Sequence, residues 1–233
     1  MISFSGKQFP KDIILMAVRW YVAYPLSYRN IEELMDERNV KVDHATLNRW
    51  VVEYSPQLEN EFRKRYKSKI HSSWRMDETY LKIKGKDIYL YRAVDKFGKT
   101  VDFMVSEKRD KAAVLRFFNK AVGKSGLPEK ITMDKSGANK AGADEINLFL
   151  FSMFCMFKTI FQITVRQIKY LNNILEQDHR AVKRITKPMM GFKALHSAEA
   201  TIAGIELHHM LKKGQHKNAG PQNIFEQFYA LAG

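Results

Sequence analysis

The chain has 233 residues, enough to bury a sizeable core in one ordinary domain and a small one. Apolar residues make up 45% and charged residues 27%, which excludes a fibrous or low-complexity chain. Lysine and arginine outnumber aspartate and glutamate by 39 to 25, and the net charge of +14 favours a polyanionic partner such as nucleic acid. Many basic proteins bind RNA or acidic lipids instead, so charge alone does not name the partner.

The single cysteine, Cys155, excludes an intramolecular disulfide and a zinc site built from several thiolates. The first ten residues lack the basic stretch and apolar core of a secretory signal. The most apolar run, residues 148–157, has nine apolar residues in ten, whereas a membrane-spanning helix needs about 20. We therefore expect a cytoplasmic protein with no membrane partner.

The first third of the chain has helical periodicity. Apolar residues repeat at helical spacing from Pro10 to Pro25, and Ser27 is placed to cap a second helix. Asp43 is placed to cap a third helix over residues 44–54. Two short helices joined by a tight turn are typical of a helix-turn-helix; a small helical bundle without a DNA role is the alternative. The polar residues of the third helix, opposite its apolar face, are His44, Thr46, Asn48 and Arg49.

A basic stretch follows these helices. Residues 61–70 contain five lysines and arginines, which predicts a linker at residues 61–71 that lies along phosphates. A solvated surface with no further role explains the same charge run. The predicted helix-turn-helix region then covers residues 1–60.

The periodicity beyond the linker changes to alternation. Three strands are predicted at residues 74–84, 88–94 and 100–106, followed by a helix that Asp110 caps. A fourth strand at 130–133, a fifth at 163–168 and helices at 175–185 and 197–211 complete the order. This order predicts an α/β domain of the RNase H-like fold with a mixed sheet, over residues 72–213. It leaves an apolar insertion at about 147–163 and a tail at 214–233.

Three carboxylates occupy positions where they could meet. Asp77 stands inside the first strand, Asp134 follows the fourth, and Glu176 lies on the next-to-last helix. A carboxylate in a half-buried strand costs free energy unless it is paired or bound to metal, and hard divalent cations prefer oxygen ligands. The alternative is that neither residue is catalytic. Asp77 would then be a salt-bridge partner, and Glu176 would lie on a solvent-exposed face of its helix.

The sequence resembles the IS6 family of bacterial insertion-sequence transposases along almost its whole length. The resemblance rests on several ordered motifs. They are FPKDIILMAVRWY at 9–21, VDHATLNRWV at 42–51, WRMDETY at 74–80, YLYRAVD at 89–95, SEKRD at 106–110, TMDKS at 132–136, RQIKYLNN at 166–173, EQDHR at 176–180 and Lys183.

The resemblance implies a DDE transposase of a bacterial cell that cleaves and joins DNA at terminal inverted repeats and in target DNA, typically by a replicative route. It implies that Asp77, Asp134 and Glu176 hold two Mg²⁺ ions, for which Mn²⁺ can substitute. Lys183 is the basic residue seven positions after Glu176 and would contact DNA near the active centre. We expect a homo-oligomer, at least a dimer on DNA. The expected DNA contacts are His44, Thr46, Asn48, Arg49, Arg166, Lys169, His179, Arg180, Lys183 and Arg184.

One feature departs from the family pattern. Asp134 and Glu176 are separated by 41 residues, and the excess falls in the apolar stretch at residues 147–163. We expect residues 148–157 to pack against the catalytic domain or a partner subunit. Two alternatives remain: a DNA-binding protein of transposase descent that no longer cuts, and an RNase H-like nuclease that hydrolyses DNA without joining ends. Asp144 and Glu145 compete with Glu176 as the third carboxylate, but they lack basic companions at helical spacing.

Overall fold

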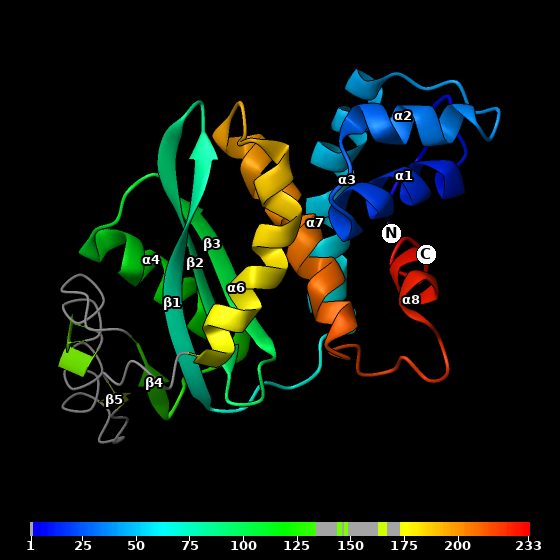
Figure 1. The fold of residues 1–233 in the computed structure, drawn as a ribbon. Coiled ribbons are helices and arrows are strands. Elements are labelled where there is room, and N and C mark those ends of the chain that lie inside the picture. The colour runs from blue at the N-terminus through cyan, green and yellow to red at the C-terminus, as the bar shows by residue number, and fades with distance from the viewer. Residues whose placement is uncertain (1, 134–143, 146, 149–162, 167–172) are drawn as a thin grey trace. The chain divides into compact units, whose positions relative to one another are not determined.

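The computed structural model describes residues 2–133, 144–145, 147–148, 163–166 and 173–233 (Figure 1). The chain divides into two compact units. The first comprises Met1–Ser68, Lys82–Gly85 and Arg180–Gly233, and the second comprises Lys69–Leu81 and Lys86–His179. Among the described residues, no helix combines the length and apolar character needed to cross a membrane.

The first unit begins with the three predicted helices, α1 (Lys11–Ala23), α2 (Tyr28–Asp36) and α3 (His44–Arg65). Ser27 caps α2 in a capping box with Asn30, whose backbone N lies 3.1 Å from the Ser27 Oγ. Asp43 caps α3 by accepting a hydrogen bond of 2.9 Å from the backbone N of Thr46. Both predicted caps are confirmed.

Helix α3 is longer than its sequence pattern predicts. Leu58 and Phe62 are fully buried, so the apolar face of the helix continues past residue 54 and stabilises it to Arg65. The segment predicted as a linker at 61–71 therefore starts inside a helix. Two basic side chains of this segment, Arg63 and Arg65, form ion pairs with glutamates one turn earlier on α3.

The C-terminal helices pack onto the N-terminal ones within the first unit. Helix α7 (Leu195–Lys212) contacts α1 and α3, and α8 (Ile224–Ala230) contacts α1 and α7. A Cβ added at Gly204 of α7 would lie 2.6 Å from Val22 Cγ1, so the close packing of α7 requires glycine there. The first unit thus takes in residues that the sequence predicted as the end of the catalytic domain and as a tail.

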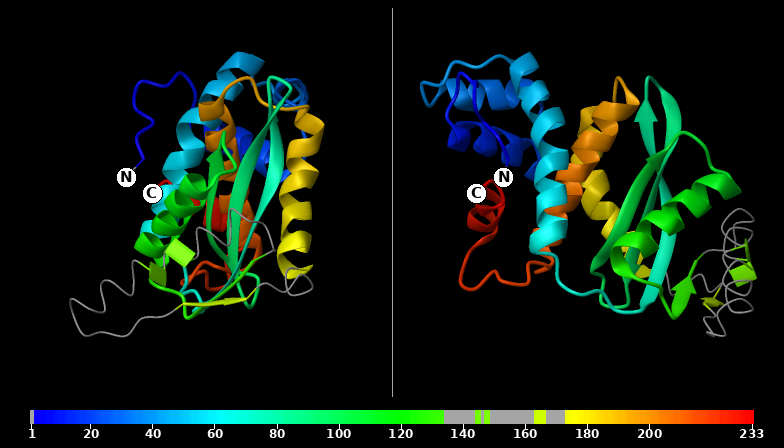
Figure 2. Two further views of the ribbon diagram at one scale, coloured as in Figure 1. Left: turned by 90° about the vertical axis from the view of Figure 1, so that its left-hand side faces the viewer. Right: turned by 180° about the vertical axis from the view of Figure 1, so that it is seen from behind.

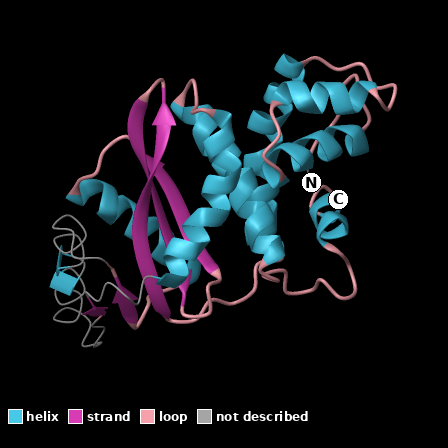
Figure 3. Ribbon diagram, viewed as in Figure 1, coloured by secondary structure: helices cyan, strands magenta, loops and turns pink. Residues whose placement is uncertain are grey.

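The second unit is built on a mixed sheet of five strands in the order β3-β2-β1-β4-β5 (Figure 3, magenta). Strands β2 and β3 pair antiparallel, whereas β4 pairs parallel with both β1 and β5. This is the RNase H-like arrangement that the sequence predicts. The strands are β1 (Ser73–Ile83), β2 (Lys86–Asp95), β3 (Thr100–Ser106), β4 (Lys130–Thr132) and β5 (Thr164–Arg166).

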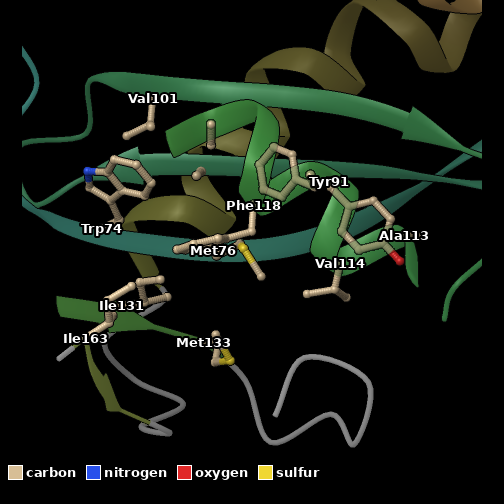
Figure 4. Packing of buried hydrophobic residues seen from close by; sticks show 13 residues of the cluster. Trp74, Met76, Tyr91, Val101, Ala113, Val114, Phe118, Ile131, Met133 and Ile163 are labelled. Carbon is tan, nitrogen blue, oxygen red and sulfur yellow. The ribbon is translucent and has the colours of Figure 1, made fainter. Parts of the chain in front are cut away.

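Helix α4 (Lys111–Ser125) packs on one face of this sheet, and the start of α6 (Asn173–Thr186) lies on the other (Figure 2). Trp74 and Met76 of β1 belong to the apolar cluster against α4 (Figure 4). Side chains alternate along a strand, so Arg75 and Asp77 lie on the opposite face. The cluster consists of Trp74, Met76, Tyr91, Ala93, Val101, Ala113, Val114, Phe117, Phe118, Ala121, Ile131, Met133 and Ile163.

The apolar run at residues 148–157 lies outside the described residues except for Leu148, whose side chain is exposed. Just before it, Asn147 is tied to the start of β5. Its side-chain amide exchanges two hydrogen bonds of 3.2 Å with the backbone N and O of Ile163. The proposed packing of the run stays a prediction.

Candidate active site

The site begins with Asp77, on the sheet face opposite the apolar cluster. Its side chain is 20% exposed, and its Oδ2 lies 3.5 Å from Nε2 of His179 on α6. This Nε2 atom is buried and makes no hydrogen bond among the described residues. The site therefore combines a partly open carboxylate with a buried nitrogen that has no hydrogen-bond partner in the part of the chain that the structure describes.

A buried ion pair fixes the start of α6 on this face of the sheet. Arg92 of β2 has no exposed surface, and its Nη2 donates to Oδ2 of Asp178 at 2.6 Å. Its Nη1 also lies 3.4 Å from Nδ1 of His179. Since a guanidinium group only donates, this contact suits Nδ1 as an acceptor and Nε2 as the atom that faces Asp77. One arginine thus orients two consecutive residues of α6.

Glu176 lies one helical turn before His179 and is exposed. Residues three apart on a helix are neighbours, with about 5–6 Å between their Cβ atoms. Glu176 therefore lies on the same face of α6 as His179. This face of the helix contacts Asp77 through the His179 ring. The contact to His179 therefore brings Asp77 and Glu176 to one side of the sheet.

Asp134, the second predicted carboxylate, lies outside the described residues, as does Lys169. The strand leading to Asp134 is described: Arg75 of β1 pairs with Thr132 of β4, and Thr132 pairs with Arg166 of β5. Arg166 is exposed at the end of β5. The carboxyl ends of β4 and β5 thus lie beside Arg75 of β1, two residues before Asp77.

The oxygen ligands present suit a hard divalent cation. In the part of the chain that the structure describes, no three His, Cys, Asp or Glu residues gather into a group that could hold a metal by itself. Asp77 and Glu176 offer two carboxylates, and the third predicted one falls outside that part. Glu145, a rival for the third position, is occupied elsewhere: its Oε2 lies 2.5 Å from Nζ of Lys111 on α4.

The predicted DNA contacts on α6 differ in their surroundings. Arg180, Lys183 and Arg184 are exposed. His179 is only 6% exposed, and its two ring nitrogens face Asp77 and Arg92. The side chain of His179 is therefore far less accessible than those of Arg180, Lys183 and Arg184, and its expected contact with DNA stays a prediction.

On α3, His44 and Arg49 are exposed, as a base-reading or phosphate-binding role requires. Nδ1 of His44 lies 3.2 Å from a Glu32 oxygen, and Nη2 of Arg49 donates to Oγ1 of Thr46 at 2.6 Å. Asn48 is half-buried and donates to the Tyr28 hydroxyl at 3.0 Å. The amide of Asn48 therefore helps to hold α2 against α3.

Two residues of the site were missed by sequence reasoning, Arg92 and Asp178. The sequence contains a sign of this pair. An arginine inside the apolar strand motif at 89–95 is expected to be buried and then needs an acidic partner. The aspartate that ends the same motif, Asp95, has a local role. It is 1% exposed and accepts hydrogen bonds of 2.9 Å from the backbone N atoms of Phe97 and Lys99, which closes the β2–β3 turn.

Comparison with known proteins agrees with this geometry. A family model described as a DDE domain matches residues 71–215. The transposase of the insertion sequence-like element IS431mec of Staphylococcus aureus is 41% identical over 212 residues, covering 90% of this chain and 88% of that protein. The transposase of IS257 in transposon Tn4003, from the same species, is 40% identical over the same shares of both chains.

Among solved structures, an intasome of simian T-cell lymphotropic virus aligns with a TM-score of 0.46 and 15% identity, covering 71% of this chain and 56% of that one. The two staphylococcal transposases, at 41% and 40% identity, are much more similar to this chain in sequence. Because the family model spans most of the chain and the relatives match nearly all of it, the chain belongs to the IS6 family of DDE transposases, a class of polynucleotidyl transferase.

Proposed function

We propose that this protein binds the terminal inverted repeats of its element and catalyses both cleavage and joining of DNA strands. The observation that carries this proposal is the buried Arg92–Asp178 pair, which holds the start of α6 beside Asp77. The pair keeps a buried charge at the start of α6 and so places His179, the next residue, against Asp77. Such a charge costs free energy unless its partner is retained.

DDE transposases use a divalent metal, and we propose that Asp77, Asp134 and Glu176 hold two Mg²⁺ ions here. Asp77 lies two residues after Arg75 and Asp134 lies two residues after Thr132, and Arg75 and Thr132 are paired. This equal spacing supports Asp134 as the second ligand. When bound, the two ions activate the attacking hydroxyl and stabilise the leaving oxygen of phosphodiester transfer.

The protein's own residues would bind and orient the DNA. Nε2 of His179 lies 3.5 Å from the Asp77 carboxylate and would limit the orientations that this carboxylate can adopt. Arg166, Arg180 and Lys183 would neutralise phosphates near the cut, since each is exposed. Arg49 of the helix-turn-helix would read the repeat, and two copies of the chain or more would act together on DNA.

The 41 residues between Asp134 and Glu176 favour one alternative, a transposase descendant that binds DNA without cutting it. A terminal repeat labelled at its end and incubated with Mg²⁺ and target DNA tests both proposals. Joined product supports the transposase. A bound complex without any cut supports the inactive descendant, and nicks without joining support a hydrolytic nuclease.

A further inference from the structure

A groove of about 720 Å³ lies within the first unit, between the helix-turn-helix and the segment that connects α6 to α7. One wall includes His44, Ala45 and Asn48 from the start of α3. The other wall is formed by residues 188–194 together with His196 and Ser197 at the start of α7. The connecting segment therefore faces the residues expected to read DNA.

The one charged side chain among the described residues that line the groove is basic. None of the described residues that line it is an aspartate or a glutamate. Lys193 supplies a positive charge and His196 supplies a ring N–H donor, and both side chains are exposed. The cap residue of α7, Ala194, offers no side-chain hydrogen bond, so the positive end of that helix adds to the same potential.

The connecting segment is held in a defined shape. Phe192 forms a bridge with Ile83 at the tip of the β1–β2 hairpin. The backbone N of Phe192 donates to the Lys82 carbonyl at 2.7 Å, and the backbone N of Lys84 donates to the Phe192 carbonyl at 2.9 Å. Gly191 has a φ of +97°, and a Cβ there would lie 3.0 Å from the Lys82 carbonyl oxygen. A segment fixed at both strand and helix can position Lys193 without much loss of entropy on binding.

We infer that residues 188–197 form a second DNA-binding element, which grips the phosphate backbone of double-stranded DNA beside the recognition helix. Lys193 and His196 contact phosphates of one strand while Arg49 reads base edges. The inference rests on the proposed function, because it assumes that α3 meets DNA. The segment between α6 and α7 then contributes to the affinity for DNA, and α3 provides the preference for a particular sequence.

The test uses the full-length Lys193→Ala/His196→Ala double variant, with Lys217→Ala, an exposed lysine of the same unit outside the groove, as the control. Binding to the terminal repeat and to random duplex DNA is measured across a salt series. We expect the double variant to lose affinity for both duplexes by the same factor. The slope of log affinity against log salt should fall by about 1 for each phosphate that the variant no longer neutralises.

The outcomes separate this inference from the proposed function. If the parent protein does not bind the repeat, the proposed function fails and the inference fails with it. If the parent binds and the double variant matches Lys217→Ala in affinity and slope, only the inference is overturned. Unchanged DNA binding with an altered sedimentation coefficient also overturns it, since the groove would then hold a protein. Thermal unfolding of each variant confirms that the fold is intact.

Discussion

The guanidinium of Arg92 and the carboxylate of Asp178 meet at 2.6 Å, with side-chain exposures of 0% and 7%. This contact joins β2 to the start of α6, and His179, the next residue, lies against Asp77. A pair buried between a sheet and a helix is expensive to break, because the remaining charge keeps its desolvation cost. The catalytic helix is therefore held by electrostatics as well as by apolar packing.

Removing one partner of this pair should destabilise the fold strongly. We expect Arg92→Met or Asp178→Leu alone to lower the free energy of unfolding by about 3–5 kcal/mol, and the double variant to recover much of that stability. Urea unfolding measures this. Arg65→Met, which breaks an ion pair with Glu61 whose arginine side chain is 59% exposed, is the matched control and should cost less than about 1 kcal/mol. Equal destabilisation in the single and double variants would contradict a paired role.

Asp77→Asn should abolish strand cleavage and joining and leave binding to the terminal repeat within about twofold, since the helix-turn-helix does not include it. A gel-shift and a strand-transfer reaction on the same preparation measure both properties. Parallel loss of binding and cutting would show that Asp77 supports the fold and has no separate catalytic role. Asp134→Asn should behave in the same way.

The third carboxylate can be identified by a pair of variants. We expect Glu176→Gln to lose Mg²⁺-dependent joining and Glu145→Gln to keep it, because the Glu145 carboxylate is engaged by Lys111 at 2.5 Å. Mn²⁺ titration followed by electron paramagnetic resonance should show weaker ion binding in Glu176→Gln alone. The reverse pattern, with Glu145→Gln inactive, would assign the third ligand to Glu145.

Gly191→Ala should displace the α6–α7 segment. The alanine would be strained at φ +97° and would meet the Lys82 backbone, so we expect a loss of about 1–3 kcal/mol in stability. Gly220→Ala is the control, because its φ is also positive but no heavy atom lies within 4 Å of the added Cβ. DNA affinity should fall for Gly191→Ala only. An unaffected affinity would mean that the shape of the segment does not matter for binding.

Acid should weaken the first unit through His208. Burial, and then the charges of Lys212, Arg19 and His209, lower the pKa of His208 to about 3. The unfolded chain, with a pKa near 6.5, binds the proton first as pH falls, so stability is full above pH 6.5 and declines below it. Between pH 7 and pH 5 this amounts to about 2 kcal/mol. His208→Leu should flatten the pH dependence of urea unfolding by that amount; an unchanged dependence would exclude His208 as its source.

The local elements and the family follow from the amino-acid sequence alone. Caps at Ser27 and Asp43, the strand pattern from residue 74 and the ordered motifs depend on residues close together in the chain, and the structure confirms these elements. The end of α3 at Arg65 is not predicted, because the last turns of this helix lie in a basic stretch whose charge pattern suits a linker. Local propensity cannot show that Leu58 and Phe62 are buried.

Which charged residues meet depends on how distant segments of the chain pack together. Arg92 and Asp178 are 86 positions apart, and their pairing depends on how α6 docks on the sheet. The same docking places His179, which is 6% exposed, beside Asp77. The fold likewise joined Phe192 to Ile83 and placed α7 against α3. Such contacts arise when distant segments share a buried surface, and periodicity along the chain carries no information about which segments these are.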